Sequence, residues 1–168
     1  MCKGLKILQA NLKKFPGVQL NLMNDESLRE FALLLVMEPS CFRNAEGKAI
    51  ITPIYHNYWT QQLPLKLHAE GAPVRSMIWV RKGMNTRPIP TSLPDLTATL
   101  LSIEGRNILA LSVYVEAKQS AEDAELNRML EEIHTVIHKT RNNIHEDLEL
   151  IIARDFNRHD PLWGGDIV

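Results

Sequence analysis

The sequence has few cysteines, no acceptor site for N-linked glycosylation and no long hydrophobic run. Its two cysteines, Cys2 and Cys41, do not have the spacing of a metal site, and the pattern Asn-x-Ser/Thr does not occur. The longest apolar run, Phe31 to Met37, is too short to cross a bilayer, and the N-terminus lacks the ordered regions of a signal peptide. We therefore expect reduced thiols in an intracellular protein, either nuclear or cytoplasmic.

The sequence also lacks an excess of positive charge. It has 19 Lys and Arg residues against 20 Asp and Glu residues, so its net charge is -1. A tight nucleic-acid binder normally carries a strongly basic surface, so we expect any contact with DNA to be local and weak. The 168 residues are 45% hydrophobic, which is enough for one domain with a core and excludes a disordered chain.

Apolar runs separated by turn residues predict an α/β fold with mixed sheets. We expect the three strands over 76–81, 96–103 and 107–115 to form a meander. Apolar residues at helical spacing predict one long helix from Ser120 to about Asn142, and Pro16 fits the first turn of a shorter helix over 18–29. Residues 40–74 are expected to be loops with one short strand near Ile50. The predicted strands are 5–12, 31–37, 76–81, 96–103, 107–115 and 148–153.

Polar side chains stand at the ends of three predicted strands. Asn11 follows the first strand, Glu38 follows the second, and Asp155 and Asn157 follow the last. If the strand ends converge, these carboxylate and amide oxygens would form a site for Mg²⁺, which completes its octahedron with water and substrate phosphate. The same pattern is explained by ordinary polar residues that end buried strands, and the spacing alone leaves both interpretations open.

Five motifs occur in an order that is typical of a known superfamily. They are Gln9-Ala-Asn11, Leu35-Val-Met-Glu38-Pro39, Arg75-Ser-Met-Ile-Trp-Val80, Leu111-Ser-Val-Tyr114 and Asp155-Phe-Asn-Arg-His159-Asp-Pro-Leu-Trp-Gly-Gly165. In this order they resemble the endonuclease/exonuclease/phosphatase superfamily, and most closely the endonuclease domain of fungal non-long-terminal-repeat retrotransposon (reverse transcriptase) polyproteins. The resemblance implies a two-sheet α/β sandwich with helices outside, in which residues 1–168 form a single, partial domain.

The resemblance also implies roles for the polar residues. Asn11 and Glu38 would hold Mg²⁺, and Asp155 would orient or deprotonate the attacking water. Asn157 would hold the scissile phosphate, and Tyr114 would donate a hydrogen bond to one of its oxygens. The last motif offers two further candidates: His159 matches a substrate-binding position or caps its loop, and Trp163 matches the retrotransposon subgroup or anchors the core.

Two features depart from the family pattern. Members of the superfamily continue to a second Asp and a Ser-Asp-His segment whose histidine completes the catalytic centre, and this chain ends at Val168 without them. Arg154 stands where the family has glycine, and its side chain either crowds the site or points away to solvent. His134 and His138 share a helix face, but a pair without a third ligand is more often a solvated surface than a metal site.

We therefore expect a truncated, catalytically impaired relative of a Mg²⁺-dependent DNA-nicking endonuclease that persists as a folded binding or interaction module. The alternative is an active Mg²⁺-dependent phosphodiester endonuclease acting on DNA. A phosphatase of small or lipid phosphates shares the scaffold but finds no support in the last motif. Because a sandwich without its final strands exposes an apolar sheet face and an unpaired edge, we also expect a homodimer through that face or edge.

Overall fold

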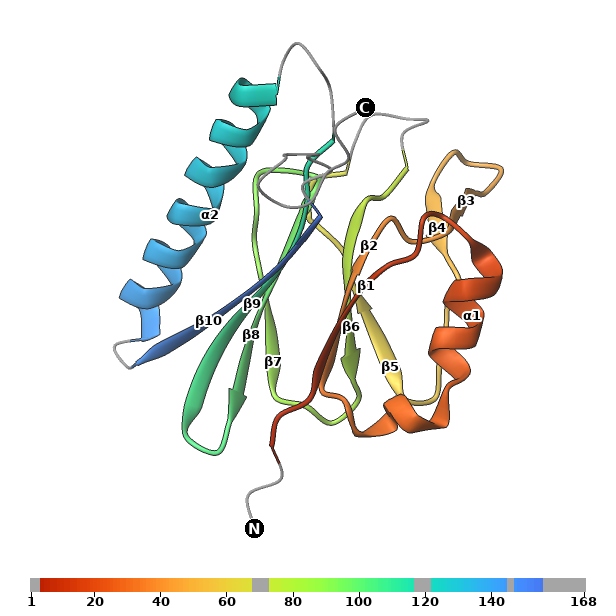
Figure 1. Ribbon diagram of the computed structural model, residues 1–168, viewed down its shortest axis with the longest axis horizontal. Helices are drawn as coiled ribbons and strands as arrows, with labels where there is room; N and C mark the ends of the chain where they lie inside the picture. Colours follow the sequence, from red (N-terminus) through yellow and green to blue (C-terminus); the bar gives the residue numbers. More distant parts are fainter. Residues whose placement is uncertain (1–3, 68–72, 117–121, 145–146, 156–168) are drawn as a thin grey trace, which may run out of the picture.

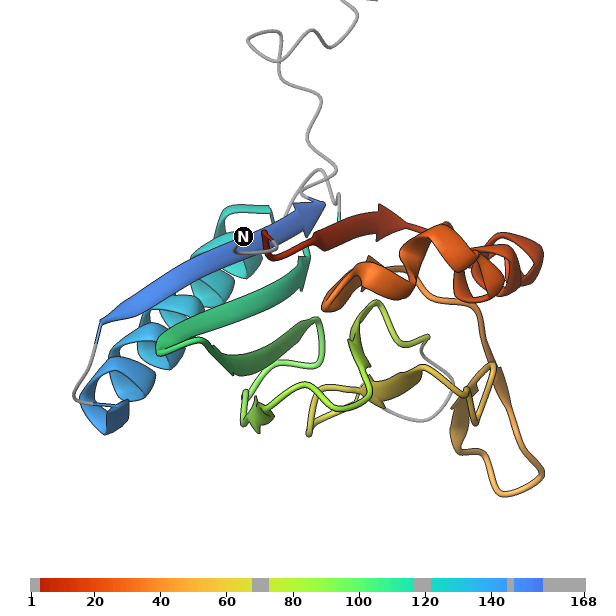
Figure 2. The ribbon, with the colours of Figure 1, turned by 90° about the horizontal axis from the view of Figure 1, so that it is seen from below.

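The computed structural model describes residues 4–67, 73–116, 122–144 and 147–155. In this part of the chain two four-stranded sheets pack face to face, and helices lie on the outer surfaces (Figures 1 and 2). The predicted α/β sandwich is therefore confirmed. No helix among the described residues is long and apolar enough to cross a membrane.

The first sheet has the strand order β1-β2-β6-β5. Strand β1 (Ile7–Asn11) is parallel to β2 (Leu33–Met37), whereas β6 (Ser76–Arg81) is antiparallel to both of its neighbours, β2 and β5 (Trp59–Gln62). A separate hairpin of β3 (Cys41–Arg43) and β4 (Ala49–Ile51) lies between β2 and β5 in the chain. The outer surface of this sheet is covered by helix α1 (Pro16–Asn24) and the 3₁₀ helix η1 (Glu26–Glu30).

The second sheet has the order β10-β9-β8-β7. Strand β10 (Leu148–Asp155) is parallel to β9 (Arg106–Tyr114), while β8 (Leu96–Ile103) is antiparallel to both β9 and β7 (Thr86–Ile89). Helix α2 (Glu122–Ile144) packs on the outer surface of this sheet. Strands β1 and β10 are thus edge strands of different sheets, and they lie side by side in both ribbon views.

Both faces of β2 are buried, which explains its unbroken apolar sequence. Leu33 and Leu35 pack in the cluster between the two sheets. Leu34 and Val36 point the other way and pack with Met23 of α1. Alternate residues of one strand therefore belong to two different parts of the core.

The predicted meander is wrong in one respect, because β6 belongs to the first sheet and not beside β8 and β9. Met77 and Trp79 of β6 pack beneath α1, and Ile78 and Val80 pack between the sheets. The connection that follows β6 carries the chain through β7 to the second sheet. A strand with two apolar faces needs cover on both sides, and nothing in that local pattern says which sheet provides it.

The smaller elements also differ from the prediction. The loop predicted for residues 40–74 contains three short strands where one was expected, since strands of three or four residues show too little alternation to be detected. The helix predicted over 18–29 ends at Asn24, because Asp25 is extended and its side chain accepts a hydrogen bond from the Ser27 amide to begin η1. Helix α2 agrees with its prediction within two residues.

A layer of buried hydroxyl groups joins the two sheets beneath one end of the sandwich. Ser76 Oγ lies 2.9 Å from Thr97 Oγ1 and 2.7 Å from the carbonyl oxygen of Ser112. Ser112 Oγ in turn donates to the carbonyl of Val36, at 3.2 Å. Because buried polar groups require partners, these bonds fix how the two sheets are aligned at this end.

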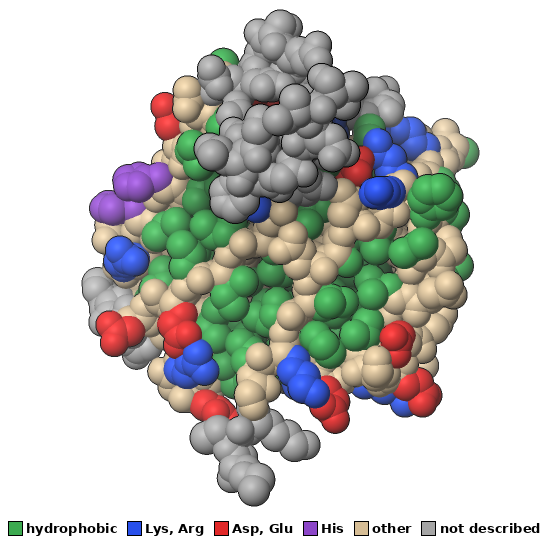
Figure 3. All heavy atoms as spheres, in the orientation of Figure 1, with side chains coloured by type: hydrophobic (Ala, Val, Ile, Leu, Met, Phe, Trp, Pro, Cys, Tyr) green, Lys and Arg blue, Asp and Glu red, His purple; other side chains and the backbone are tan. Residues whose placement is uncertain are grey.

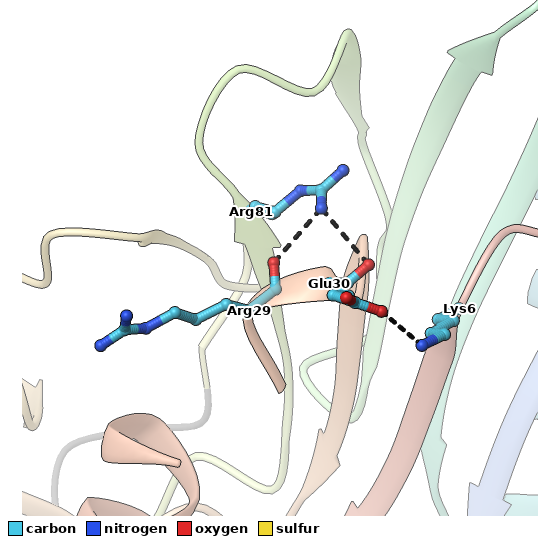
Figure 4. A network of polar contacts seen from close by, with 4 residues as sticks. All are labelled: Lys6, Arg29, Glu30 and Arg81. Atoms are coloured by element: carbon cyan, nitrogen blue, oxygen red, sulfur yellow. Dashed lines mark hydrogen bonds and ion pairs between the residues drawn. The ribbon is translucent and has the colours of Figure 1, made fainter. Parts of the chain in front are cut away.

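At the opposite end the strands are joined by charged side chains on the surface (Figure 4). Lys6 Nζ contacts Glu30 Oε2 at 2.5 Å, and both side chains are exposed. Arg81 Nη1 donates to the carbonyls of Arg29 and Glu30, at 3.2 and 3.3 Å. These contacts link β1, η1 and β6.

Candidate active site

The candidate site lies at the end of the sandwich where four strands finish. In the sheet register Asn11 is opposite Met37, the residue before Glu38, and Asp155 is opposite Tyr114. A hydrogen bond of 2.9 Å from Gln9 Nε2 to the carbonyl of Arg154 joins the two edge strands close to this end. The structure thus brings the ends of β1, β2, β9 and β10 together, as the converging-strand interpretation requires.

Glu38 begins the turn after β2 with an unusual backbone conformation. Its φ is 48°, a left-handed value that few residues other than glycine adopt, and it is held by backbone bonds on both sides. The amide of Glu38 donates to the carbonyl of Arg75, and its carbonyl accepts from the amide of Lys14, each at 2.8 Å. The side chain is only 15% exposed, and its Oε1 lies 3.3 Å from Lys14 Nζ. A largely buried carboxylate is therefore fixed at this edge with a lysine as counter-ion.

Asn11 closes β1 and shapes the turn that follows it. Its Oδ1 accepts a hydrogen bond of 2.8 Å from the amide of Lys13. Lys13 and Lys14 both have positive φ values, 48° and 62°, and this tight turn brings the Lys14 ammonium back to Glu38. Figure 3 shows cationic side chains gathered beside this turn, next to an acidic one.

Arg75 reaches this edge from the start of β6 and connects it to the second sheet. Its guanidinium lies 5.4 Å from the centre of the Tyr114 ring, and its Nη1 is 2.9 Å from Glu116 Oε2. Partial burial alone would lower the pKa of Arg75, but the hydrogen bond that Arg75 donates to Glu116 and the charges of Asp95, Glu116 and Tyr114 together raise it. The guanidinium therefore stays charged, stacked on the tyrosine that the motif implicates in phosphate binding.

Asp95 completes this group from the start of the second sheet. It is buried, with 5% of its surface exposed, and its carbonyl accepts a 3.0 Å hydrogen bond from the amide of Tyr114. Arg75, Asp95, Glu116 and Lys14 were not among the site residues predicted from the sequence. The motif that begins at Arg75 was the one available signal, because it places a cation directly before a buried strand.

The last motif lies largely outside the described residues. Asn157, His159 and Trp163 are not described, and the position of Asp155 is defined by its backbone at the end of β10. Arg154 is exposed and alternates along β10 with the buried Ala153, which agrees with the interpretation that its side chain points to solvent.

Asn11 and Glu38 have the oxygen ligands that Mg²⁺ prefers, and the ion characteristically takes only one or two protein carboxylates and keeps its waters. The donor set at this edge therefore fits Mg²⁺, although the described residues contain no group of three or more His, Cys, Asp or Glu side chains that could hold a metal. His134 and His138 stack on α2 with ring centres 6.3 Å apart, and both are exposed, far along the chain from Asn11 and Glu38.

No family model and no curated protein matches the sequence. Solved structures do match. The endonuclease domain of TRAS1, a telomere-specific non-LTR retrotransposon, is 21% identical with a TM-score of 0.68, and the match covers 96% of this chain and 63% of that domain. Truncated TDP2 from Caenorhabditis elegans is 13% identical with a TM-score of 0.56, covering 94% of this chain and 64% of that one. Beta toxin from Staphylococcus aureus has the same identity and TM-score, covering 94% and 67%.

This chain therefore spans less than two thirds of the length of the TRAS1 domain and of the C. elegans protein. At such low identities the likeness defines the fold and leaves the chemistry to the residues of this chain. The TM-scores of 0.68 and 0.56 show that the chain shares its overall fold with these neighbours. The chain has the endonuclease/exonuclease/phosphatase fold.

Proposed function

We propose that this chain is a retrotransposon-type endonuclease domain that retains the metal- and phosphate-binding side of the site, cleaves DNA poorly by itself and serves as a folded binding module. One observation carries the proposal. The described strands bring Glu38, Asn11, Arg75 and Tyr114 to one edge, whereas the described histidines lie elsewhere.

The residues at this edge would bind and orient a phosphodiester. Glu38 and Asn11 would hold Mg²⁺, which when bound neutralises charge on the phosphate and on the leaving oxygen. Tyr114 would donate a hydrogen bond from its hydroxyl to a phosphate oxygen. Asp155 would orient or deprotonate the attacking water, and Asn157 would hold the scissile group.

Weak cleavage is proposed because the described part of the chain places no histidine at this edge. His56 accepts a hydrogen bond from the Tyr58 amide just before β5, at the opposite end of the sandwich. His134 and His138 are exposed on α2. Lys14 also pairs with Glu38, so a metal ion has to compete with this ammonium for the carboxylate.

The second candidate is an active Mg²⁺-dependent endonuclease, favoured by the same arrangement of Glu38, Asn11 and Tyr114. Incubation of supercoiled plasmid with the purified chain in Mg²⁺ separates the two. We expect nicking at the background level, equal in the wild type, in Glu38→Ala and in the control Glu30→Ala from the opposite end. Robust nicking that Glu38→Ala abolishes and Glu30→Ala preserves would contradict the first proposal and support the second.

DNA is the proposed ligand, and this implies a nuclear or cytoplasmic location. Because the net charge is -1, we expect phosphates to meet a local group of cations, which among the described residues at this end includes Lys13, Lys14 and Arg75, so few counter-ions are released. We expect binding of a duplex to vanish as salt approaches about 150 mM. Submicromolar affinity at that salt concentration, measured by fluorescence anisotropy, would contradict this expectation.

We also propose that a second copy of the chain pairs with the edge strand β10. Leu150 and Ile152 are 42% and 41% exposed there, and Figure 3 shows hydrophobic side chains on the face that carries β1 and β10. A two-fold axis through Ile151 sets Leu150 of one copy opposite Ile152 of the other in an antiparallel pair, so that each covers the other. The unpaired backbone N–H and C=O groups at the edge of β10 would then find partners in both copies.

Light scattering over a wide range of concentrations tests this assembly. We expect a mass near twice 19.1 kDa for the wild type and a mass near 19.1 kDa for Ile152→Glu. Ile54→Glu is the control, since Ile54 is also exposed but lies away from β10. A wild-type protein that is monomeric at every concentration would overturn the dimer.

A further inference from the structure

Arg75 has a fixed backbone and a side chain that reaches from one sheet to the other. Its carbonyl accepts a hydrogen bond from the amide of Glu38, which directly follows β2 of the first sheet. The next residue, Ser76, is fully buried and hydrogen-bonded to the second sheet through Thr97 and Ser112. The Arg75 side chain, 15% exposed, then extends over the Tyr114 ring. The cation is thus held in place from both sides.

Glu116 makes the charged contact with this guanidinium. Its Oε2 is 2.9 Å from Arg75 Nη1, and its side chain is 32% exposed, about twice as exposed as that of Arg75. The arginine is therefore the buried member of the pair, and the carboxylate lies on the solvent side of it. An anion arriving from solvent would meet the position of this carboxylate first.

A guanidinium binds carboxylates and phosphates with the same planar set of N–H donors, so the two anions compete for one position. The hydrogen bond to Glu116 and the nearby charges of Asp95, Glu116 and Tyr114 raise the pKa of Arg75 in this arrangement, so the guanidinium is charged when it pairs with Glu116. Tyr114, whose hydroxyl is the proposed phosphate donor, lies against the same guanidinium. A phosphate bound to Arg75 would therefore also lie close to Tyr114.

We propose that Arg75 is an anion-binding residue for a nucleic-acid phosphodiester, and that the Glu116 carboxylate occupies this position until the phosphodiester displaces it. The proposal rests on the proposed function, because it assigns the ligand of the same edge. Glu116 then acts as an internal competitor that weakens phosphate binding. It also keeps the largely buried guanidinium paired when no ligand is present.

Dimethyl phosphate is a suitable probe, since it carries the phosphodiester group alone and its binding requires neither metal nor cleavage. Its dissociation constant is measured by NMR titration without Mg²⁺ for the wild type, Glu116→Gln, Arg75→Gln and Arg75→Lys. The matched control is Glu149→Gln, which removes the carboxylate from the Arg106–Glu149 pair at the opposite end.

We expect Glu116→Gln to bind dimethyl phosphate about 3- to 10-fold more tightly, because the competing charge is gone while the arginine remains. Arg75→Gln should lose saturable binding. Arg75→Lys should keep part of it, because an ammonium retains the charge but not the planar set of donors. Glu149→Gln should bind as the wild type does.

The proposal is overturned if Glu116→Gln binds no more tightly than the wild type, or if Arg75→Gln binds equally well while its near-UV circular dichroism shows a native fold. If Arg75→Gln does not fold, the comparison of Glu116→Gln with Glu149→Gln decides the question alone. The proposed function fails separately: a chain that binds dimethyl phosphate through Arg75 but nicks plasmid robustly in Mg²⁺ refutes the proposed weak cleavage and keeps this inference.

Discussion

The two ends of the sandwich use charged residues in opposite ways. At the candidate site the charges are largely buried, with the side chains of Glu38 and Arg75 each 15% exposed. At the other end the pairs lie in water, where Lys6 and Glu30 are 52% and 68% exposed. Charges interact strongly where water is excluded and weakly where it screens them. Charged residues at the first end can thus select a ligand, while those at the second end interact only weakly with their partners.

The turns at the two ends explain this difference. The β8–β9 hairpin at the far end closes through Glu104 and Gly105, whose φ values of 50° and 76° fit a type I′ turn. Such a turn leaves little chain to cover its charges, and the hollow of about 400 Å³ beside it has Lys6, Glu30, Arg81 and Glu104 in its wall. At the site end the turn through Lys13 and Lys14 returns to β2, and Glu38 is held there by hydrogen bonds with the Arg75 carbonyl and the Lys14 amide.

The largest effect should come from the hydroxyl layer beneath the site. Ser76→Ala removes the group that contacts Thr97 Oγ1 and the Ser112 carbonyl, and leaves both partners buried. We expect a loss of about 1 to 3 kcal/mol in the free energy of unfolding, measured by urea denaturation. The control is Ser102→Ala, whose hydroxyl contacts Asn107 near the other end. Equal losses for the two variants would break the comparison between the ends.

The next effect tests the two arginine–carboxylate pairs directly. Arg75→Gln leaves Glu116 without its partner in a partly buried site, and we expect a loss of about 1 to 2 kcal/mol of stability. Arg106→Gln breaks a bidentate pair with Glu149 in which both side chains are exposed, and we expect no measurable change in stability. A loss for Arg106→Gln as large as that for Arg75→Gln would show that burial does not set the strength of these pairs.

A smaller effect concerns pH. Burial lowers the pKa of His56 below its ordinary value of 6.5, and the charges of Lys82 and Arg29 lower it further. The unfolded chain therefore binds this proton more readily, so the stability that His56 contributes is fully present above pH 6.5 and is lost as pH falls through the folded-state pKa. The melting temperature of His56→Gln should consequently fall less than that of the wild type between about pH 7.5 and 5.5. A larger fall in the melting temperature of the variant than of the wild type would contradict a lowered pKa for His56 in the folded protein.

The smallest effect is expected for the network in Figure 4. Glu30→Gln removes the contact with Lys6 but leaves the bonds from Arg81 to the main chain. Exposed ion pairs are typically worth about 0 to 1 kcal/mol, so we expect an unchanged melting temperature at physiological salt. A drop of several degrees at low salt that becomes smaller as salt is added would show that this end is held by charge after all.

Much of the fold follows from local patterns in the sequence. The unbroken apolar run of β2, the helical spacing of α2 and the strand before Arg154 were all predictable, because each pattern reports burial of its own segment. The order of the motifs also predicted Asn11, Glu38 and Tyr114 as site residues, and the structure places all three at one end of the sandwich. The short strands β3, β5 and β7 were not, since three or four residues at an edge leave almost no periodic signal.

The sequence by itself determined the class of fold and the residues that end its strands, because periodicity and motif order are properties of the chain. Only the tertiary structure decided that β6 crosses to the first sheet, that Glu38 is held in a left-handed conformation by Arg75, and that Glu116 pairs with the same arginine. These features depend on contacts between segments far apart in the chain. The alignment of the two sheets decides which side chains are buried and which charges meet at those contacts. No single segment of the sequence therefore predicts them.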